Sequence, residues 1–366
     1  MSRKRPSSTI TATTPSDQRP REEKSAPYED PRYETLLELN GSYMVEDPVG
    51  LASASRDLCR SLLENSQPIP SDTLFRDDIF KTTIQNLRQK NEARVIQDIT
   101  RLIVPSAENL FIFGGAKHLD VLTESVNEGW NNSIPLTDPR PQPDYSVGFR
   151  RTAFTKDQFD KLSPFIGDFL GGDQSFFMAT YYIYFPFLTC EVKCGATALD
   201  TADRQNAHSM TLAVRGIVEL FRCVKRENEA NRQILAFSIS HSNEDVRIYG
   251  HYPVINGKDT KYYRYLIKRI DLIDPDGKDK WVAYRFTRNV YDIWMPAHFK
   301  NICSAVDQLP SDLDFGVPPL SGASGLSQDE SVEQNSRSSN AGVTPDTSFT
   351  RPEARPEAAK RRKGQA

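Results

Sequence analysis

The sequence predicts one α/β domain, built on a mixed β-sheet flanked by helices and held between two disordered tails. Three observations support this prediction. Both ends of the 366-residue chain are poor in large apolar side chains. The stretch between them alternates helical and strand-like periodicity, an order typical of helices packed on a sheet. A run of aromatic and β-branched residues over 176–193 has the composition of a buried strand.

The two tails are distinguished by their composition. Residues 1–30 are rich in Ser, Thr, Pro, Arg and Lys, and residues 311–366 in Ser, Gly, Asn, Pro and Glu. Such segments bury too little apolar surface to offset the entropy lost on ordering. The predicted organisation is a disordered basic tail over 1–30, an irregular lead-in over 31–75 with a helix near 51–64, an α/β domain over 76–310 with its best-supported core at 139–309, and a disordered tail with a basic end over 311–366.

Within the domain, apolar residues at three- and four-residue spacing predict helices, and apolar residues at alternate positions predict strands. The clearest helix covers 201–227, where Met210, Val214, Ile217 and Phe221 form one apolar stripe. The predicted helices cover residues 77–102, 116–127, 156–166, 201–227 and 291–309. The predicted strands cover residues 144–149, 176–193, 234–240, 246–255, 262–270 and 281–286.

The charge of the chain is unevenly distributed. The net charge is −3, but residues 1–25 carry about +3 and residues 351–366 about +4, which leaves about −10 for the remainder. An acidic domain disfavours non-specific binding to nucleic acid, which depends on contacts of Lys and Arg with phosphate. The five cysteines are an odd number, and no secretory signal is recognisable, so reduced thiols in a reducing compartment are expected. No apolar run reaches the about 20 residues that a bilayer requires, so no membrane span is expected.

A charged pair at the end of the most apolar strand is the strongest functional signal. The period of two places Glu191 and Lys193 on one face of this strand, and Cys190 and Cys194 on the other. Two buried charges there are costly unless they are paired or bind a metal. Asp144, 47 positions before Glu191, begins another predicted strand. Two carboxylates suit Mg²⁺ or Mn²⁺, which prefer oxygen ligands, and the ammonium group of Lys193 suits activation of water and stabilisation of charge on a phosphate.

These residues also carry a resemblance to a known family. A Pro-Asp dipeptide ends at Asp144, and a Glu-x-Lys triplet runs from Glu191 to Lys193. Together with a following helix that carries Gln205, these motifs resemble the PD-(D/E)XK nuclease superfamily. The resemblance implies a restriction-endonuclease-like fold in which Asp144 and Glu191 bind the metal, Lys193 is catalytic, and Gln205 supports the site. Some members have a further ligand on the preceding helix, and Glu124 is the candidate here.

A second resemblance is more specific in sequence but implies no activity. The block from about residue 139 to residue 309 is similar to an uncharacterised domain that is common in filamentous fungi. Three stretches carry this similarity: PDYSVGF at 143–149, TCEVKC at 189–194 and ADRQNAHSM at 202–210.

Each candidate residue also has a purely structural interpretation. Glu191 and Lys193 are suited to a salt bridge at the end of a sheet, and Asp144 to the start of a strand after a proline turn. Gln205 is suited to a solvated position in the first turn of a helix, and Glu124 to an ordinary helix surface.

The leading hypothesis is a metal-dependent nuclease that hydrolyses phosphodiester bonds in DNA or RNA, with Mg²⁺ or Mn²⁺ as cofactor and nucleic acid as partner. The alternative is a nuclease-fold module that has lost catalysis and binds nucleic acid or a protein partner. The acidic charge of the domain favours the alternative, and the three charged motif residues favour the first. Basic residues interleaved with tyrosines over 247–269 are a further candidate contact with nucleic acid, or a solvated hairpin.

Short basic runs lie in both predicted tails. One consists of Arg3, Lys4 and Arg5, and the other runs from Lys360 to Lys363. Runs of this kind serve as nuclear import signals, so we expect a nuclear location. The competing interpretation is a charged tail that only increases solubility.

Overall fold

The computed structural model describes residues 21–168, 172–194, 199–274 and 277–310. Both basic runs, and the whole of the predicted tail over 311–366, lie outside the described residues. Within the described part, none of the helices combines the length and the apolar character that crossing a bilayer would require.

Seven strands form one mixed sheet in the order β1-β7-β6-β5-β4-β3-β2. Adjacent strands are antiparallel except for β1 with β7 and β4 with β5, which run parallel. Helix α9 (Leu199–Cys223) connects β4 to β5, as a crossover between parallel strands requires. The strands are β1 (Ser42–Tyr43), β2 (Leu122–Val126), β3 (Tyr145–Phe149), β4 (Tyr184–Val192), β5 (Ala236–His241), β6 (Asp245–Asn256) and β7 (Asp259–Asp271).

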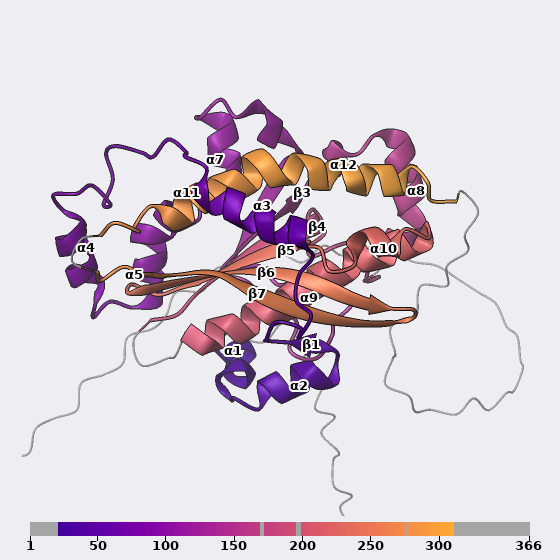
Figure 1. Ribbon diagram of the computed structural model, residues 1–366, viewed down its shortest axis with the longest axis horizontal. Helices are drawn as coiled ribbons and strands as arrows, with labels where there is room; N and C mark the ends of the chain where they lie inside the picture. Colours follow the sequence, from indigo (N-terminus) through magenta and orange to yellow (C-terminus); the bar gives the residue numbers. More distant parts are fainter. Residues whose placement is uncertain (1–20, 169–171, 195–198, 275–276, 311–366) are drawn as a thin grey trace, which may run out of the picture. The chain divides into compact units, whose positions relative to one another are not determined.

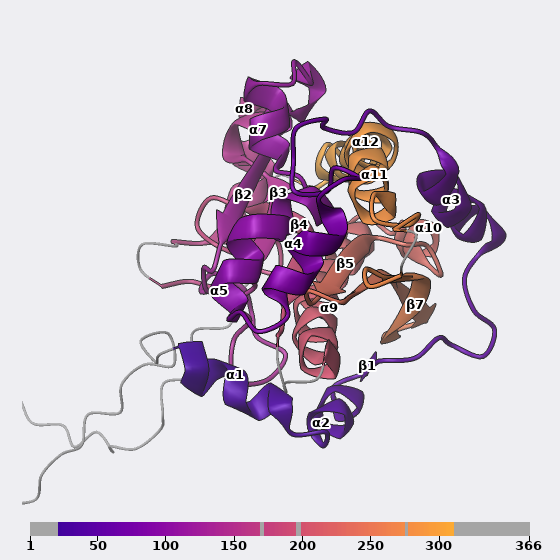
Figure 2. The ribbon, with the colours of Figure 1, turned by 90° about the vertical axis from the view of Figure 1, so that its left-hand side faces the viewer.

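Helices cover both faces of this sheet (Figure 1). Helix α9 packs on one face, and α1 (Arg21–Glu29) and α2 (Tyr33–Leu39) lie beneath it, as the second view also shows (Figure 2). On the other face lie α3 (Ser53–Glu64), α11 (Val282–Asn289) and α12 (Met295–Val306). The remaining helices are α4 (Phe80–Leu87), α5 (Glu92–Val95), α6 (Arg101–Ile103), α7 (Ala107–Ile112), α8 (Lys156–Ile166) and α10 (Glu227–Ala230). Because α9 is enclosed between the sheet and α1–α2, even the charged residues Asp203 and Arg204 near its start are buried.

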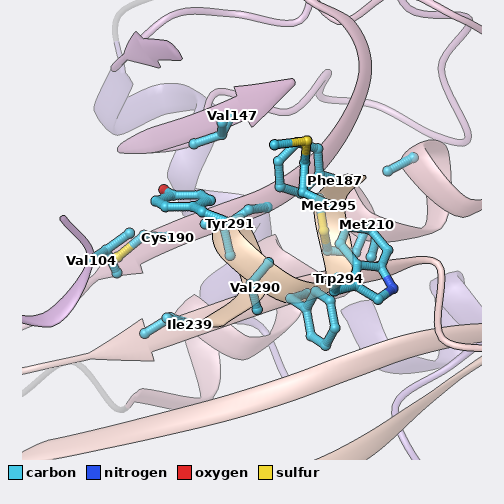
Figure 3. Close-up of a cluster of buried hydrophobic side chains, with 14 of the residues drawn as sticks. Val104, Val147, Phe187, Cys190, Met210, Ile239, Val290, Tyr291, Trp294 and Met295 are labelled. Carbon is cyan, nitrogen blue, oxygen red and sulfur yellow. The ribbon is translucent and has the colours of Figure 1, made fainter. Parts of the chain in front are cut away.

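The layer between the sheet and α11–α12 is apolar. Phe237 of β5 packs its ring against Trp294 and Phe286, with centroids 5.0 and 5.5 Å apart. Figure 3 shows Tyr291 lying against Cys190 of β4, with Val147 of β3 beyond them. These side chains are buried or nearly so, and burial of this area stabilises the fold by about 25 cal/mol per Å². The thiol of Cys190 is therefore part of the core, where burial raises its pKa above the ordinary value.

Gly148 of β3 allows a close approach of β4. A Cβ atom there would lie 2.8 Å from the carbonyl oxygen of Tyr184 and 3.0 Å from Cα of Pro186, and these backbone atoms cannot move away as a side chain can. We expect Gly148→Ala to lower the free energy of unfolding by about 1–3 kcal/mol, measured by urea denaturation. Gly129→Ala is the matched control, because its Cβ would meet only the flexible side chain of Asn131. Equal effects of the two changes would contradict this account.

Most elements with strong periodicity are confirmed. The strands predicted at 144–149, 234–240, 246–255 and 262–270 correspond to β3, β5, β6 and β7, and the helices at 51–64, 156–166 and 201–227 to α3, α8 and α9. The predicted mixed sheet flanked by helices is also confirmed.

Two predicted elements are wrong. The helix over 116–127 is a 3₁₀ turn at Lys117–Val121 followed by β2, because the backbone of Leu122–Val126 pairs with β3. The strand over 281–286 is helix α11, which buries Ala283, Phe286 and Thr287 at helical spacing.

Three other segments have different limits from those predicted. The helix over 77–102 is divided into α4, α5, a π-helical turn at Ile96–Thr100, and α6. The strand over 176–193 begins only at Tyr184, since the preceding aromatic residues pack as a loop, with Phe177 stacked on Phe185. Besides the predicted helix α3, the predicted tail and lead-in contain α1, α2 and β1, because Tyr28 and Tyr33 are buried against α9 and order the segment.

Candidate metal and catalytic site

Asp144, directly before β3, lies opposite Glu191 of β4. The register of β3 and β4 pairs Tyr145 with Cys190, and one step further along this register places Asp144 opposite Glu191. Oδ2 of Asp144 accepts the backbone N–H of Val192 at 2.8 Å. Only 4% of Asp144 and 1% of Glu191 is exposed. The two carboxylates therefore lie at the same end of β4, within the interior of the protein.

Lys193 lies beside them and is held from two sides. Its Nζ donates to the carbonyl oxygen of Val192 at 2.9 Å and to Oε1 of Glu92, at the start of α5, at 3.4 Å. Its backbone N–H donates to the carbonyl oxygen of His241 at 3.0 Å. The ammonium group is thus buried, and a carboxylate 101 positions earlier neutralises it.

Sequence analysis missed Glu92. This residue lies within the helix predicted at 77–102, and no apolar pattern or motif distinguishes it from other surface charges there. The signal that could have identified Glu92 is the resemblance to the PD-(D/E)XK superfamily, because some members of that superfamily have a further carboxylate ligand on the preceding helix. Applied to every predicted helix before Asp144, that expectation would have included Glu92 as well as Glu124.

The structure does not bring Glu124 to the other two carboxylates. Glu124 lies on β2, opposite Val147, on the face of the sheet that carries Tyr145. Its carboxylate accepts hydrogen bonds from the hydroxyl groups of Ser106 at 2.7 Å and Tyr145 at 2.5 Å, and from the backbone N–H of Ala107 at 3.1 Å. Glu124 therefore satisfies the first turn of α7, a role that follows from its being on a strand rather than on the predicted helix.

Gln205 lies in the part of α9 that is fastened to β4 and β5. Its neighbour Asn206 accepts a hydrogen bond from the hydroxyl group of Thr189 at 2.6 Å and donates to Ser240 at 2.9 Å. Glu191 pairs with Ser240 in the sheet, so α9 crosses the strands beside Glu191. Gln205 is 6% exposed, and its amide oxygen has no hydrogen-bond partner among the residues that the structure describes.

His241 of β5 contacts both Lys193 and the π-helical turn that follows α5. Its Nε2 lies 2.9 Å from the hydroxyl group of Thr100, in the π-helical turn that follows α5, and its Nδ1 lies 3.0 Å from the carbonyl oxygen of Ser242. Burial lowers its pKa to about 4, so the imidazole is neutral at pH 7. Its backbone carbonyl positions Lys193. Turns of π-helix are frequent at functional sites.

The N-terminal helices cover α9 next to this site. The hydroxyl groups of Tyr28 and Tyr33 lie 2.9 and 3.2 Å from Nδ1 of His208, and Tyr28 also donates to the carbonyl oxygen of Pro139. Burial is the main cause that raises the pKa of Tyr28, with Tyr33 next and the charge of Glu191 contributing as well. The segment predicted as a disordered tail therefore forms part of the wall near Glu191.

The basic hairpin of β6 and β7 is largely a structural element. Nη1 of Arg247 lies 2.6 Å from Oδ2 of Asp203 on α9, and the hydroxyl group of Tyr249 donates to the same oxygen at 3.0 Å. Arg264 approaches this carboxylate at 4.0 Å. These contacts hold α9 on the sheet, and they leave Lys258 and Lys261 exposed at the turn.

The donor set suits a hard divalent cation. Asp144 and Glu191 offer carboxylate oxygens, and Gln205, next to Asn206 on the part of α9 that is bonded to β4 and β5, has a buried amide oxygen. Across the described residues, no group of three or more His, Cys, Asp and Glu side chains is gathered as metal ligands. An ion at this place would therefore complete its shell with backbone oxygens and water, as Mg²⁺ commonly does.

Comparison with known proteins gives one match. A family model described as "Domain of unknown function (DUF7924)" matches residues 79–306, which include every residue of the candidate site. No curated protein and no solved structure matches the chain significantly.

Proposed function

Since this chain belongs to the DUF7924 family, a domain of unknown function, we propose its function from its own site: a metal-dependent nuclease that hydrolyses phosphodiester bonds in DNA or RNA. The observation that carries the proposal is the convergence of Asp144, Glu191 and Lys193 at the end of β4. Burying two carboxylates and an ammonium group costs several kcal/mol per ion in order of magnitude, a cost that a bound cation and an anionic substrate would offset.

Each residue has a role in this proposal. Asp144 and Glu191 would hold Mg²⁺ or Mn²⁺ through their carboxylate oxygens. The bound ion would supply a Lewis acid and a water molecule of lowered pKa. Lys193 places a positive charge beside the two carboxylates, where charge develops on the phosphate in the transition state. Glu92 restrains the ammonium group of Lys193, and Gln205 supports the site from α9.

One observation favours the alternative, a nuclease-fold module that binds nucleic acid or a protein without hydrolysis. The ammonium group of Lys193 is already engaged by Glu92 and by the carbonyl oxygen of Val192. In an inactive module these contacts would be the whole role of Lys193. In a nuclease, the weaker contact, with Glu92 at 3.4 Å, would yield to the substrate phosphate.

A cleavage assay on the full chain separates the two. Labelled single- and double-stranded DNA and RNA are incubated with the protein in Mg²⁺, in Mn²⁺ and in EDTA. We expect at least one substrate to be cut with either metal and none in EDTA, because the carboxylates alone cannot activate water. If no substrate is cut in any condition, the nuclease proposal is wrong and the binding module remains. Cutting that continues in EDTA would point to another site.

A further inference from the structure

A polar groove adjoins the candidate site on its α5 side. It has a volume of about 720 Å³ and lies between α4 and the start of α5, in the region that faces the viewer in Figure 2. Asn86, Gln89, Lys90, Asn91 and Arg94 provide its polar lining. All five are exposed, so an extended ligand could lie across them.

The wall of this groove continues directly into the site. Asn91 caps α5, because its Oδ1 accepts the backbone N–H of Arg94 at 3.1 Å. The next residue, Glu92, reaches Nζ of Lys193 at 3.4 Å. A polymeric ligand bound in the groove at Asn91 would therefore lie next to Glu92, the residue whose carboxylate contacts Nζ of Lys193.

The charge in the groove is positive, although the domain around it is acidic. Lys90 and Arg94 line the groove together with one acidic residue, Asp98, which is already paired with Arg94 at 2.7 Å. The side-chain amides of Asn86 and Gln89 add N–H donors, which suit phosphate and sugar oxygens. A linear polyanion with many acceptor oxygens is the ligand class that matches this lining.

From these contacts, we propose that the groove between α4 and α5 binds the sugar–phosphate backbone of the nucleic-acid substrate and leads it to Lys193. This inference rests on the proposed function, because it gives the substrate a path to that site. Lys90 contacts a phosphate, and the amides of Asn86 and Gln89 contact backbone oxygens without selecting a base sequence.

The test measures binding apart from cleavage. The full chain is kept in EDTA, and the anisotropy of labelled DNA and RNA gives Kd at several salt concentrations. Lys90→Glu should raise Kd about 3- to 10-fold and reduce the slope of log Kd against log salt by about one, as expected for one lost phosphate contact. Lys81→Glu is the matched control, because Lys81 is an exposed lysine on α4, close in sequence to Lys90, and lines a different hollow.

The outcomes separate this inference from the proposed function. If Lys90→Glu and Lys81→Glu weaken binding equally, the groove is not the path, whether or not the protein cuts nucleic acid. If Lys90→Glu alone weakens binding but the unaltered chain cuts nothing, the groove is supported and the nuclease proposal fails. The same measurement is made with a labelled phosphopeptide. If Lys90→Glu weakens binding of the phosphopeptide and leaves nucleic-acid binding unchanged, the groove binds a protein partner and the inference is wrong. Both variants change exposed side chains, so their thermal unfolding midpoints should match that of the unaltered chain.

Discussion

Replacing Lys193 with Met, or Asp144 or Glu191 with the matching amide, should lower the rate of metal-dependent cleavage by at least about 10²-fold. The amides keep the size of the carboxylates but lose the charge that binds a divalent cation. Met keeps the apolar stem of Lys193 but loses the ammonium group. Initial rates at saturating Mg²⁺ on the best substrate measure the effect. Combining the changes should cost little more than the largest single change, because the residues act as one unit.

Glu124→Gln is the matched control for Glu191→Gln. The chemical change is the same, but Glu124 lies on the opposite face of the sheet, bound to Tyr145 and the first turn of α7. We expect this variant to unfold at a lower temperature, since buried hydrogen bonds to a charged group are lost, and to keep its cleavage rate within about threefold when folded. Equal loss of cleavage in the two variants would contradict the assignment of the metal site to Asp144 and Glu191.

The second large effect concerns acid stability. Four histidines are buried, and burial lowers the pKa of His208, His251 and His298 to about 3 and that of His241 to about 4. In the unfolded chain each would titrate near its ordinary value of about 6.5. We therefore expect the protein to lose most of its stability between pH 6.5 and about pH 4.5, well before most carboxylates are protonated.

The direction of this pH dependence follows from the numbers of protons that the folded and the unfolded states bind. Above pH 6.5 the four imidazoles are neutral in both states, and stability does not depend on them. Below pH 6.5 the unfolded chain binds protons that the folded chain excludes, so the free energy of unfolding falls by about 1.4 kcal/mol per pH unit for each histidine. At pH 5 the total is roughly 8 kcal/mol, comparable to the whole stability of a typical domain.

Urea denaturation at a series of pH values tests this expectation. His298→Phe keeps an aromatic ring against Trp294, on which His298 stacks at 4.2 Å, and removes one titrating group. It should reduce the slope of stability against pH by about a quarter between pH 6 and pH 5. His118→Gln, at an exposed position paired with Asp292, should leave the slope unchanged. A stability that stays constant from pH 7 to pH 5 would show that the buried histidines do not control it.

Part of the site was predictable because its signal is local. The alternation of Tyr145, Val147 and Phe149 identifies β3, and the same period in the run before Lys193 puts Glu191 and Lys193 on one face of β4. Local periodicity shows which side of a strand faces the core. It therefore placed charged residues at the end of a buried strand, where burial of a charge is costly unless the charge is paired or binds a metal. It could not report that Lys193 meets Glu92, since nothing in the neighbourhood of Glu92 differs from an ordinary helix surface.

Glu124 shows the limit most clearly. Residues 116–127 have a pattern compatible with a helix, but the second half of the segment, Leu122–Val126, pairs with β3 and becomes β2. That pairing moves Glu124 to the face of Tyr145 and away from Asp144. Backbone pairing with residues 19 to 27 positions away made this segment a strand rather than a helix, and a local pattern does not contain that information.

The sequence by itself determined the mixed α/β class, the strands β3, β5, β6 and β7, the long helix α9, and the three charged residues on which the proposed function rests. Tertiary structure determined that Glu92 rather than Glu124 approaches Lys193, and that Tyr28, 180 positions before His208, closes the wall over α9. The physical reason is the range of the interactions. Alternation and helical stripes express burial of neighbouring residues, whereas these contacts exist only because the burial of the whole chain brings distant segments together.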